Sequence, residues 1–535
     1  MKNPLSVHWN SHQYSKFNSL IFDYLNQQSG AVDLYHRFPD ENSILDQSAE
    51  KIEKYKHRQI LHAALEQQLS SFDLTAKQKE NFHKLSLPET VTITTGHQLN
   101  LFTGPLFFFN KILQLIKCCD EMNQKHKTYN FVPVFWMATE DHDFEEINHF
   151  FFRDKKISWN RQSGGAVGRM DLNGIDEVFD EFFDEIEDSD RKDELKKIVN
   201  DTYLNSKNLT EATQKLVQLI FADRGLLMID GDDRELKKLM IPVFETDLFE
   251  QTAFRKISET NQKMIEKGYP VQVNPREINL FYLGDGSIRE RIVFEDGKFK
   301  VLNSDYEFSK EEIRKELYDY PEKFSPNVIL RPIYQETVLP NIAYIGGAGE
   351  SAYWLQLKSF FDEMKIPFPL VIVRNTVLLL SSKQHQKLEK LGISYKELME
   401  PLNEIINQNI TQNSTVEIDF EAYENSIQKI FDELTEKAVQ TDITFSKMVD
   451  AQRTKQLKGL DKLKKRLLRA EKRKYAERVG SVKKIYNELF PQNNLQERVV
   501  NFSELYLEYG FDFMDEIIGE IKPIEFCFSI KTVNK

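Results

Sequence analysis

The fold is decided by TTGHQLNLFTGPLFFFNKILQLIK, residues 94–117, where a strand, a glycine and a histidine lead into a helix started by a proline. Residues 91–95 are predicted to form a short buried strand, Gly96 permits a sharp exit from it, and Pro105 suits a first helical turn. Open α/β sheets bind ligands at such junctions, because helix N-terminal amides attract anions such as phosphate. Four polar residues are expected to line this loop: His97, Gln98, Asn100 and Thr103.

A second apolar strand, residues 132–138, also ends in polar residues. Three carboxylates and an imidazole follow it: Glu140, Asp141, His142 and Asp143. This cluster could bind magnesium or zinc, accept a proton from a substrate amine, or only bond neighbouring backbone. In an extended segment His142 points away from Asp141 and Asp143, so one shared ion is not required. We favour amine recognition and general-base catalysis by Asp141 and His142, with Asp143 and Asn148 on the same surface and no metal ligands assigned.

A third strand-to-helix turn contains three glycines and one carboxylate: Gly346, Gly347, Gly349 and Glu350. The glycines would let the backbone approach a ligand, although such turns also occur without ligands. Glu350 is expected to cap the next helix or to bind an ammonium group. Arg331, in a predicted core strand over residues 329–334, and Arg374 could neutralise a carboxylate or a phosphate.

The 535 residues are too many for one simple core, and strands alternate with helices as in a doubly wound parallel sheet. The predicted class is therefore α/β, with a Rossmann-like parallel sheet, connecting insertions and a long α-helical coiled-coil domain. The expected segments are 1–150, first half of the core; 151–225, helical insertion; 226–268, core; 269–325, small antiparallel insertion; 326–380, second half of the core; 381–499, coiled coil; and 500–535, a C-terminal segment returning to the core.

Several segments resemble the cysteine ligase family of bacillithiol biosynthesis. They are TTGHQLNLFTGPLFFFNK, VPVFWMATEDHDFEEINH (132–149), SPNVILRPIYQETVLPNIAYIGGAGESAYWLQL (325–357) and the long charged helices beyond. The resemblance extends over essentially the whole chain. It implies a core similar to that of class I aminoacyl-tRNA synthetases, a coiled-coil homodimer, and addition of cysteine to glucosaminyl-malate.

Joining these substrates requires an activated cysteine carboxylate, either an adenylate or an acyl phosphate, so ATP is implied, with AMP or ADP as product and Mg²⁺ as a possible counter-ion. His97 and the helix start near Gly104 would then face the phosphates, and Gln98 or Thr103 would donate hydrogen bonds. The alternative is that His97 only caps a turn. The stretch FTGP, residues 102–105, lacks the two histidines of the class I signature, and the lysine-rich loop of those enzymes is missing. The motifs alone therefore do not establish adenylate chemistry.

After residue 381 the sequence is mostly polar, and its apolar residues recur at helical spacing. One apolar stripe contains Tyr423, Ile430 and Met448. A helix over 453–490 would be ~57 Å long and would need a partner helix for its apolar seam. Twelve Lys or Arg residues lie between 453 and 478. They are interpreted as a solvated face, since aromatic residues for base stacking are absent before Tyr475.

The net charge of −13 argues against general affinity for nucleic acid or anionic membranes. No apolar stretch reaches the roughly 20 residues of a membrane span, and the amino terminus lacks a secretory pattern, so a soluble cytoplasmic protein is expected. Its three cysteines, Cys118, Cys119 and Cys527, are predicted to be buried free thiols. Two other functions remain open: a metal-dependent amide or phosphate hydrolase using residues 140–143, and a non-enzymatic coiled-coil scaffold with a nucleotide site.

Overall fold

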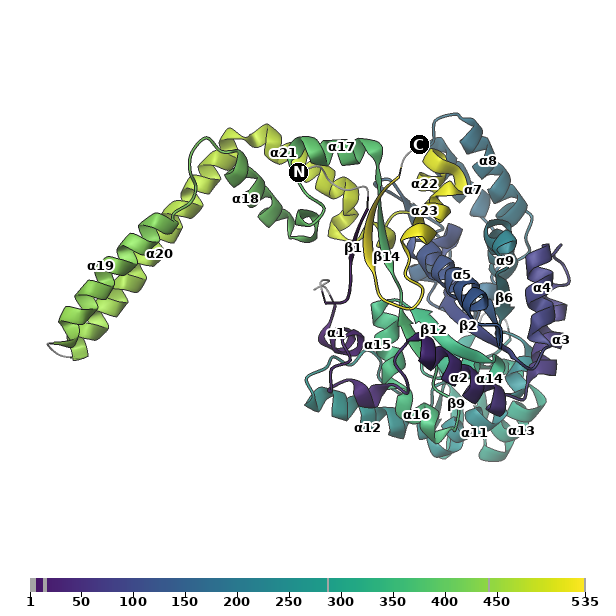
Figure 1. Ribbon diagram of the computed structural model, residues 1–535. Helices are drawn as coiled ribbons and strands as arrows, with labels where there is room; N and C mark the ends of the chain where they lie inside the picture. Colours follow the sequence, from purple (N-terminus) through teal and green to yellow (C-terminus); the bar gives the residue numbers. More distant parts are fainter. Residues whose placement is uncertain (1–5, 13–16, 286–287, 441–442, 534–535) are drawn as a thin grey trace. The chain divides into compact units, whose positions relative to one another are not determined.

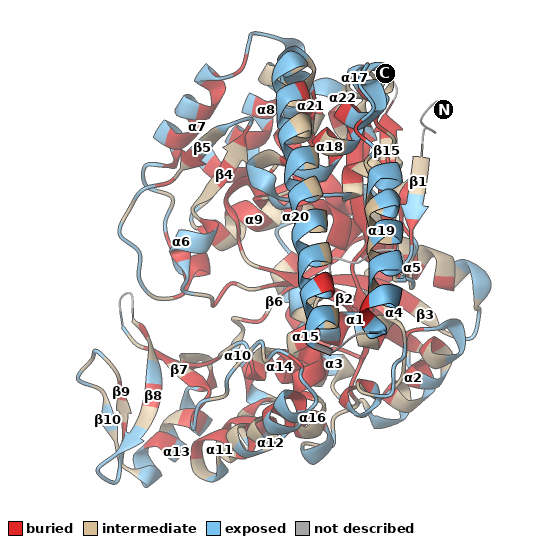
Figure 2. Ribbon diagram, turned by 90° about the vertical axis from the view of Figure 1, so that its left-hand side faces the viewer, coloured by how far each residue is buried: buried red, intermediate tan, exposed pale blue. Residues whose placement is uncertain are grey.

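The computed structural model describes residues 6–12, 17–285, 288–440 and 443–533. The chain forms two units (Figure 1). The larger unit comprises residues 8–378 and 496–531, and the smaller one is built mainly from residues 379–495. Buried residues concentrate in the sheet and flanking helices of the larger unit (Figure 2).

A five-stranded parallel sheet forms the centre of the larger unit, in the order β13-β12-β2-β3-β6. The strands are β2 (Thr90–His97), β3 (Asn130–Met137), β6 (Leu227–Asp230), β12 (Asn341–Gly346) and β13 (Leu370–Val373). Every residue of β2 is buried, as is typical of a parallel sheet covered on both faces. The predicted Rossmann-like parallel sheet is confirmed.

Helices cover this sheet. The amino-terminal region is helical, with α1 (Ser19–Leu25), α2 (Glu41–Lys54), α3 (Arg58–Leu69) and α4 (Ala76–Leu85). Helix α5 (Phe107–Lys125) packs on β2 and β3 and buries Cys118 and Cys119. These two cysteines and Cys527 are buried and free, which confirms that prediction.

The first insertion begins after the short helix α6 (Phe144–Ile147) with a hairpin of β4 (His149–Phe152) and β5 (Lys155–Ser158). Helices α7 (Ile175–Asp184), α8 (Asp190–Val199) and α9 (Leu209–Phe221) follow. Phe179 and Phe182 of α7 contact Phe102 of the β2–α5 loop. The insertion is therefore anchored on this loop.

The second insertion is an antiparallel sheet in the order β10-β9-β8-β7-β11. Its strands are β7 (Leu280–Leu283), β8 (Arg289–Glu295), β9 (Lys298–Val301), β10 (Glu307–Phe308) and β11 (Phe324–Pro326). Helices α11 (Ile241–Glu250) and α13 (Lys310–Asp319) pack against this sheet, whereas α10 (Arg234–Lys238) and α12 (Thr252–Glu266) contact other helices. Residues 269–279, predicted to begin the sheet, contain no strand.

The predicted core strand at 329–334 is wrong, because these residues begin helix α14 (Leu330–Val338). The side-chain oxygen of Asn327 accepts from the backbone N–H groups of Ile329 (2.9 Å) and Leu330 (3.3 Å), which starts the helix. A short buried apolar run fits either a strand or a helix, so periodicity did not separate the two. The glycine turn after β12 is followed by two helices, α15 (Ala348–Gln356) and α16 (Lys358–Glu363).

The smaller unit contains α17 (Ser382–Leu391), α18 (Leu402–Asn413), α19 (Glu421–Val439), α20 (Ile443–Lys474) and α21 (Ala476–Leu489). Helices α19 and α20 pack side by side as a long hairpin with mostly exposed residues (Figures 1 and 2). Residues 453–490 do not form a single helix, since Tyr475 leaves helical geometry (φ −101°, ψ 34°) and separates α20 from α21.

The C-terminal segment forms α22 (Phe502–Tyr509), α23 (Phe513–Glu520) and β15 (Phe528–Val533). Helix α23 packs on α5, and Lys117 Nζ donates to the carbonyls of Ile518 and Ile521, both at 2.8 Å. Strand β15 lies outside the five-stranded sheet, in a separate sheet between β1 (Ser6–Trp9) and β14 (Thr376–Ser381). Within the described residues, no helix has both the length and the apolar composition needed to cross a bilayer.

Candidate active site

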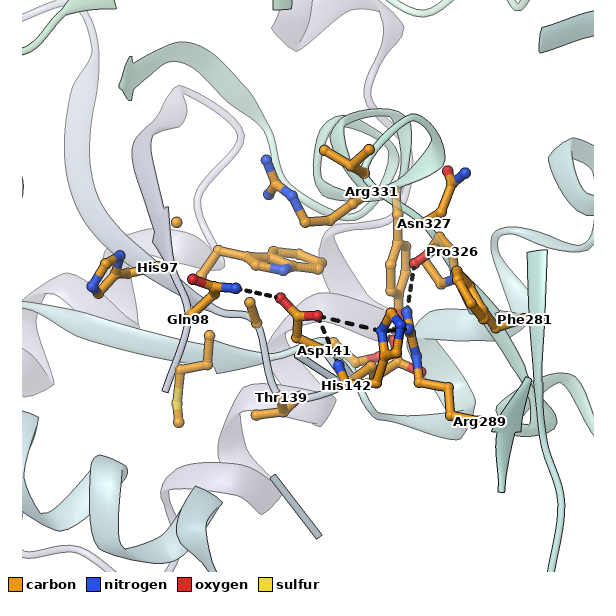
Figure 3. A pocket seen from close by; sticks show the side chains of 18 of the residues that line it. His97, Gln98, Thr139, Asp141, His142, Phe281, Arg289, Pro326, Asn327 and Arg331 are labelled. Atoms are coloured by element: carbon orange, nitrogen blue, oxygen red, sulfur yellow. Dashed lines mark hydrogen bonds and ion pairs between the residues drawn. The ribbon is translucent and has the colours of Figure 1, made fainter. Parts of the chain in front are cut away.

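A cavity of about 600 Å³ opens at the carboxyl ends of β2 and β3 (Figure 3). Strand β2 contributes Gly96 and His97 with the adjoining Gln98, and the end of β3 leads into residues 138–142 of the lining. Helix α14 and the antiparallel insertion close the other side. The carboxyl ends of parallel strands are the usual ligand-binding edge of such a sheet. The cavity also has the size of a small-molecule site.

His97 lines the cavity from the end of β2 and is 9% exposed. Its ring lies 5.2 Å from the Phe107 ring and 5.3 Å from the Phe108 ring, between centroids. Burial, with a smaller effect of the Lys111 charge, lowers the pKa of His97 to about 3. Its Nε2 atom has no hydrogen-bond partner among the described residues. His97 is thus a neutral imidazole with an unsatisfied nitrogen, which suits hydrogen bonding to a ligand.

Lys111 and Glu350 form an ion pair beside His97. Lys111 Nζ lies 2.6 Å from Glu350 Oε2 and donates to the carbonyl of Gly96 at 3.0 Å. Burial would raise the pKa of Glu350, but Lys111 and the N–H of Gly347 (2.8 Å) outweigh this and hold it below its usual value. Glu350 therefore caps α15, as one of its two predicted roles requires, and lines the cavity as an anion.

Asp141 is the central carboxylate of the cavity (Figure 3). Gln98 Nε2 donates to Asp141 Oδ2 at 2.8 Å, and the N–H of His142 donates to Asp141 Oδ1 at 2.7 Å. Burial raises the pKa of Asp141, yet hydrogen bonds from His142 and Gln98 and the Arg289 charge bring it well below its usual range. A carboxylate of such low pKa is a weak base. The geometry therefore favours binding of an ammonium group by Asp141 over proton abstraction.

His142 is held by Arg289 of strand β8. Arg289 Nη1 lies 2.6 Å from His142 Nδ1, whereas Asp141 Oδ1 lies 3.6 Å from the same nitrogen. A guanidinium has only donors, so His142 accepts at Nδ1 and, when neutral, carries its proton on Nε2. In this tautomer Nε2 of His142 is a hydrogen-bond donor. The contact with Arg289 therefore does not favour the predicted role of His142 as a general base.

Arg289 is fixed on three further sides. Its guanidinium carbon lies 4.1 Å from the Phe281 ring centroid, Nε donates to Ser325 Oγ at 3.1 Å, and Nη2 donates to the Pro326 carbonyl at 3.3 Å (Figure 3). The residue is 7% exposed. Arg289 is thus a rigid support that sets the orientation of the His142 ring.

A cluster of charged residues lies behind Thr139 and Glu140 of the cavity lining. Glu140 pairs with the fully buried Lys237, and Arg169 donates to both oxygens of Asp232 at 2.7 Å. Thr139 donates to Asp230, whose pKa burial and the Asp232 charge raise to about 7. No group of three or more His, Cys, Asp or Glu side chains within the described ranges is arranged to hold a metal ion.

Three predicted loop residues, Asn100, Thr103 and Gly104, are absent from the cavity lining. The C-terminal segment covers their turn, since Asn501 Nδ2 donates to the carbonyls of Phe102 (2.8 Å) and Gly104 (2.7 Å). The N–H of Leu106 likewise donates to the Val500 carbonyl at 2.8 Å. The chain itself therefore occupies part of the helix start that was expected to attract a phosphate.

Five other predicted residues also lie outside the lining: Asp143, Asn148, Gly346, Gly347 and Gly349. Asp143 is exposed at the start of α6, and the Asn148 carbonyl accepts from Trp159 N–H at 2.7 Å. Gly346 leaves room for the Tyr344 ring, which an added Cβ would approach to 3.0 Å. Gly347 and Gly349 belong to the start of α15. The structure thus brings together Gly96, His97, Gln98, Asp141, His142 and Glu350.

The two arginines noted in the sequence have different surroundings. Arg331, in the first turn of α14, lines the cavity and donates to Tyr353 Oη and Gln335 Oε1 at 3.3 and 3.2 Å. The missing side chain of Gly96 lets Arg331 approach the end of β2, since an added Cβ would lie 3.3 Å from its Nη1. Arg374 instead makes two hydrogen bonds, of 2.6 and 2.7 Å, to the buried Glu497.

Sequence reasoning missed several lining residues. They are the aromatic walls Trp136, Tyr334 and Tyr344, and the insertion residues Phe281, Arg276, Arg289 and Arg291. It also missed Lys111, although a polar pair within the apolar run FFFNKIL was a usable signal. The insertion residues carried no comparable signal, because their place depends on how the insertion folds back.

The five-stranded parallel sheet and the cavity at its strand ends define a Rossmann-like α/β protein, and the cavity lies at the ligand-binding edge of that class. The family comparison is equally clear. The model of the N-terminal Rossmann-like domain of bacillithiol biosynthesis BshC matches residues 7–375, and that of its C-terminal coiled-coil domain matches residues 377–533. The chain belongs to this family, which confirms the resemblance noted in its sequence.

Curated relatives agree over nearly the full length. A protein of Flavobacterium johnsoniae named "Putative cysteine ligase BshC" is 47% identical over 519 residues, covering 97% of this chain and 98% of the relative. Proteins with the same name from Flavobacterium psychrophilum and Christiangramia forsetii are 45% and 43% identical. These alignments cover 96% and 97% of this chain, and 97% of each relative.

Proposed function

We propose that this protein is a cytoplasmic ligase that joins the carboxyl group of cysteine to the amine of glucosaminyl-malate, with ATP activating the cysteine carboxylate. The observation that carries the proposal is the convergence of an anionic Asp141, an anionic Glu350 and a neutral His97 on one cavity. Family membership and the names of the relatives support cysteine ligation.

The proposed reaction has two steps, in which the lining residues bind the reactants. The cysteine carboxylate displaces pyrophosphate or ADP to form a mixed anhydride; the sugar nitrogen then attacks the carbonyl carbon, releasing AMP or phosphate and one proton. Asp141 offers negative charge to one amino group, and Glu350, paired with Lys111, offers a hydrogen-bond acceptor to the other. His97 Nε2 and Arg331 offer hydrogen-bonding partners to anionic oxygens. Mg²⁺ would serve as the counter-ion of the nucleotide. Positioning and charge stabilisation are the contributions of the protein itself.

We further propose that α19 and α20 form a homodimer contact. Tyr423 and Ile430 of α19 and Met448 and Leu463 of α20 are 56–62% exposed. Exposed apolar side chains along a helical hairpin indicate an interface, and a second copy of the chain supplies a matching surface. The coiled-coil match to the family model supports this assignment.

The test of the ligase is direct. Purified protein, cysteine, glucosaminyl-malate, ATP and Mg²⁺ should yield the cysteinyl conjugate, measured by mass spectrometry together with AMP and ADP. Asp141→Asn and His97→Phe should reduce the rate at least 10-fold, whereas Asp143→Asn, exposed and outside the lining, should not. A folded protein that forms no conjugate under varied nucleotide and metal conditions would refute the proposal. Release of free amine or phosphate instead would favour the hydrolase.

A further inference from the structure

Four arginines line the cavity, and two of them lack protein partners. Arg289 donates to Ser325, to the Pro326 carbonyl and to His142, and Arg331 donates to Gln335 and Tyr353, so both have protein partners. Arg276 and Arg291 also line the cavity, yet in the described part of the chain neither guanidinium makes a hydrogen bond or an ion pair. Two positive charges therefore face the cavity without neutralisation.

The strand register explains why Arg291 faces the cavity. Arg291 of β8 pairs across the sheet with Phe281 of β7, and Arg289 lies two residues earlier on β8. Residues two apart on a strand, and directly opposed residues on adjacent strands, share one face of a sheet. All three side chains line the cavity, so this face of the insertion is one of its walls.

Arg276 is held in place by a buried hydrogen-bond network. Its N–H donates to Asn279 Oδ1 at 3.0 Å, and its carbonyl accepts from Asn279 Nδ2 at 2.8 Å. Asn279, 1% exposed, also donates from Nδ2 and from its backbone to the fully buried Asp247, at 3.0 and 2.6 Å. The N–H of Asn327, a lining residue, donates to the Asn279 carbonyl at 3.1 Å. The backbone of Arg276 is therefore preorganised relative to the cavity wall.

We propose that Arg276 and Arg291 form a subsite for the carboxylates of a dicarboxylate moiety carried by the amine substrate. The inference rests on the proposed function, in which that substrate is glucosaminyl-malate. A guanidinium binds a carboxylate through two parallel hydrogen bonds, and two unpaired guanidiniums match two carboxylates. The anionic Asp141 lies in the same cavity and offers the complementary charge for the amine. Both parts of an amino-dicarboxylate thus meet opposite charges within one cavity.

The experiment measures binding by isothermal titration calorimetry of the full chain with three probes: malate, glucosaminyl-malate and MgATP. Arg276→Gln and Arg291→Gln should each weaken binding of malate and glucosaminyl-malate at least 10-fold and leave MgATP affinity within twofold. Arg498→Gln, an exposed arginine outside the cavity lining, is the charge-matched control. Glu290→Gln, on the opposite face of β8, controls for disturbance of the strand. Circular dichroism verifies that each variant is folded.

The possible outcomes distinguish the proposed subsite from the proposed ligase activity. Loss of MgATP binding with unchanged malate binding would assign the two arginines to the nucleotide phosphates and overturn the proposal. Unchanged binding of all three probes would overturn it as well. If the wild-type chain forms the conjugate and the variants retain the wild-type KM for glucosaminyl-malate, the subsite is wrong while the ligase stands. If the variants lose malate binding but the wild type forms no conjugate, the subsite stands and the ligase is wrong.

Discussion

Replacement of Lys111 by methionine tests the buried ion pair beside His97. Lys111 is 3% exposed, and its partner Glu350 retains contacts to Gly347 N–H (2.8 Å) and to Tyr344 Oη (3.2 Å) after the change. Removing one member of a buried pair costs about 3–5 kcal/mol, because a charge remains without its counter-ion. Since the Glu350 side chain is 28% exposed, we expect the lower end, about 3 kcal/mol.

Differential scanning calorimetry measures this loss of stability as a decrease in the melting temperature. The larger unit has about 400 residues, and an unfolding entropy of ~2.1 cal/mol/K per residue gives ~0.8 kcal/mol/K. The melting temperature of this unit should therefore fall by ~4 °C. Lys125→Met, on the same helix, is the matched control: Lys125 is 47% exposed and lies 3.4 Å from Glu41, a surface pair worth less than about 1 kcal/mol.

A double variant separates charge from packing. Adding Glu350→Gln to Lys111→Met removes the stranded charge, so the double variant should melt above the single Lys111→Met variant. The reasoning is refuted if Lys111→Met melts within 1 °C of Lys125→Met, or if the second substitution lowers the melting temperature further.

Three further predictions concern the His142 tautomer, the pH dependence of stability and dimerisation. Arg289→Met removes the donor that holds His142 Nδ1, so ¹⁵N-detected NMR should show the Nε2–H tautomer in the wild type and a mixture of tautomers in the variant. A mixture in both proteins would contradict the tautomer assignment. Burial raises the pKa of Asp247 from 3.8 to about 7, so folding favours the protonated carboxyl group. As the pH rises from about 4 to about 7, the free energy of unfolding should therefore decrease by an amount on the order of 4 kcal/mol. Asp247→Asn should flatten this part of the stability profile, and an unchanged slope would exclude the residue as its source. Finally, Met448→Glu should lower the dimer fraction measured by sedimentation, whereas a change at Lys465, already paired with Asp461 at 2.7 Å, should not.

The parallel sheet was predictable because its signals are local. Residues 91–95 and 132–138 are apolar runs with polar ends, and they form the adjacent strands β2 and β3. The strand predicted at 329–334 was wrong because a buried run of six residues has no periodicity that excludes a helix. The break at Tyr475 was missed for a related reason, since no proline or glycine marks it.

The site was predictable only in part. His97, Gln98, Asp141 and His142 follow neighbouring strands of one parallel sheet, so their meeting at its edge follows from chain order and strand direction. Asn100, Thr103 and Gly104 lie in the same loop, yet contacts from Asn501, about 400 residues away, cover them. Local sequence holds no information about such a distant cover.

The amino-acid sequence by itself determined where the buried strands lie, which polar residues follow them, and that a long helical region comes after the α/β core. Strand and helix periods act over a few residues, and that range is sufficient for these features. The tertiary structure alone decided that Lys111 neutralises Glu350, that Arg289 sets the His142 tautomer, and that Arg276 and Arg291 face the cavity. These features depend on contacts between segments more than 100 residues apart, whose geometry is set only when the core helices and the insertion pack against the sheet.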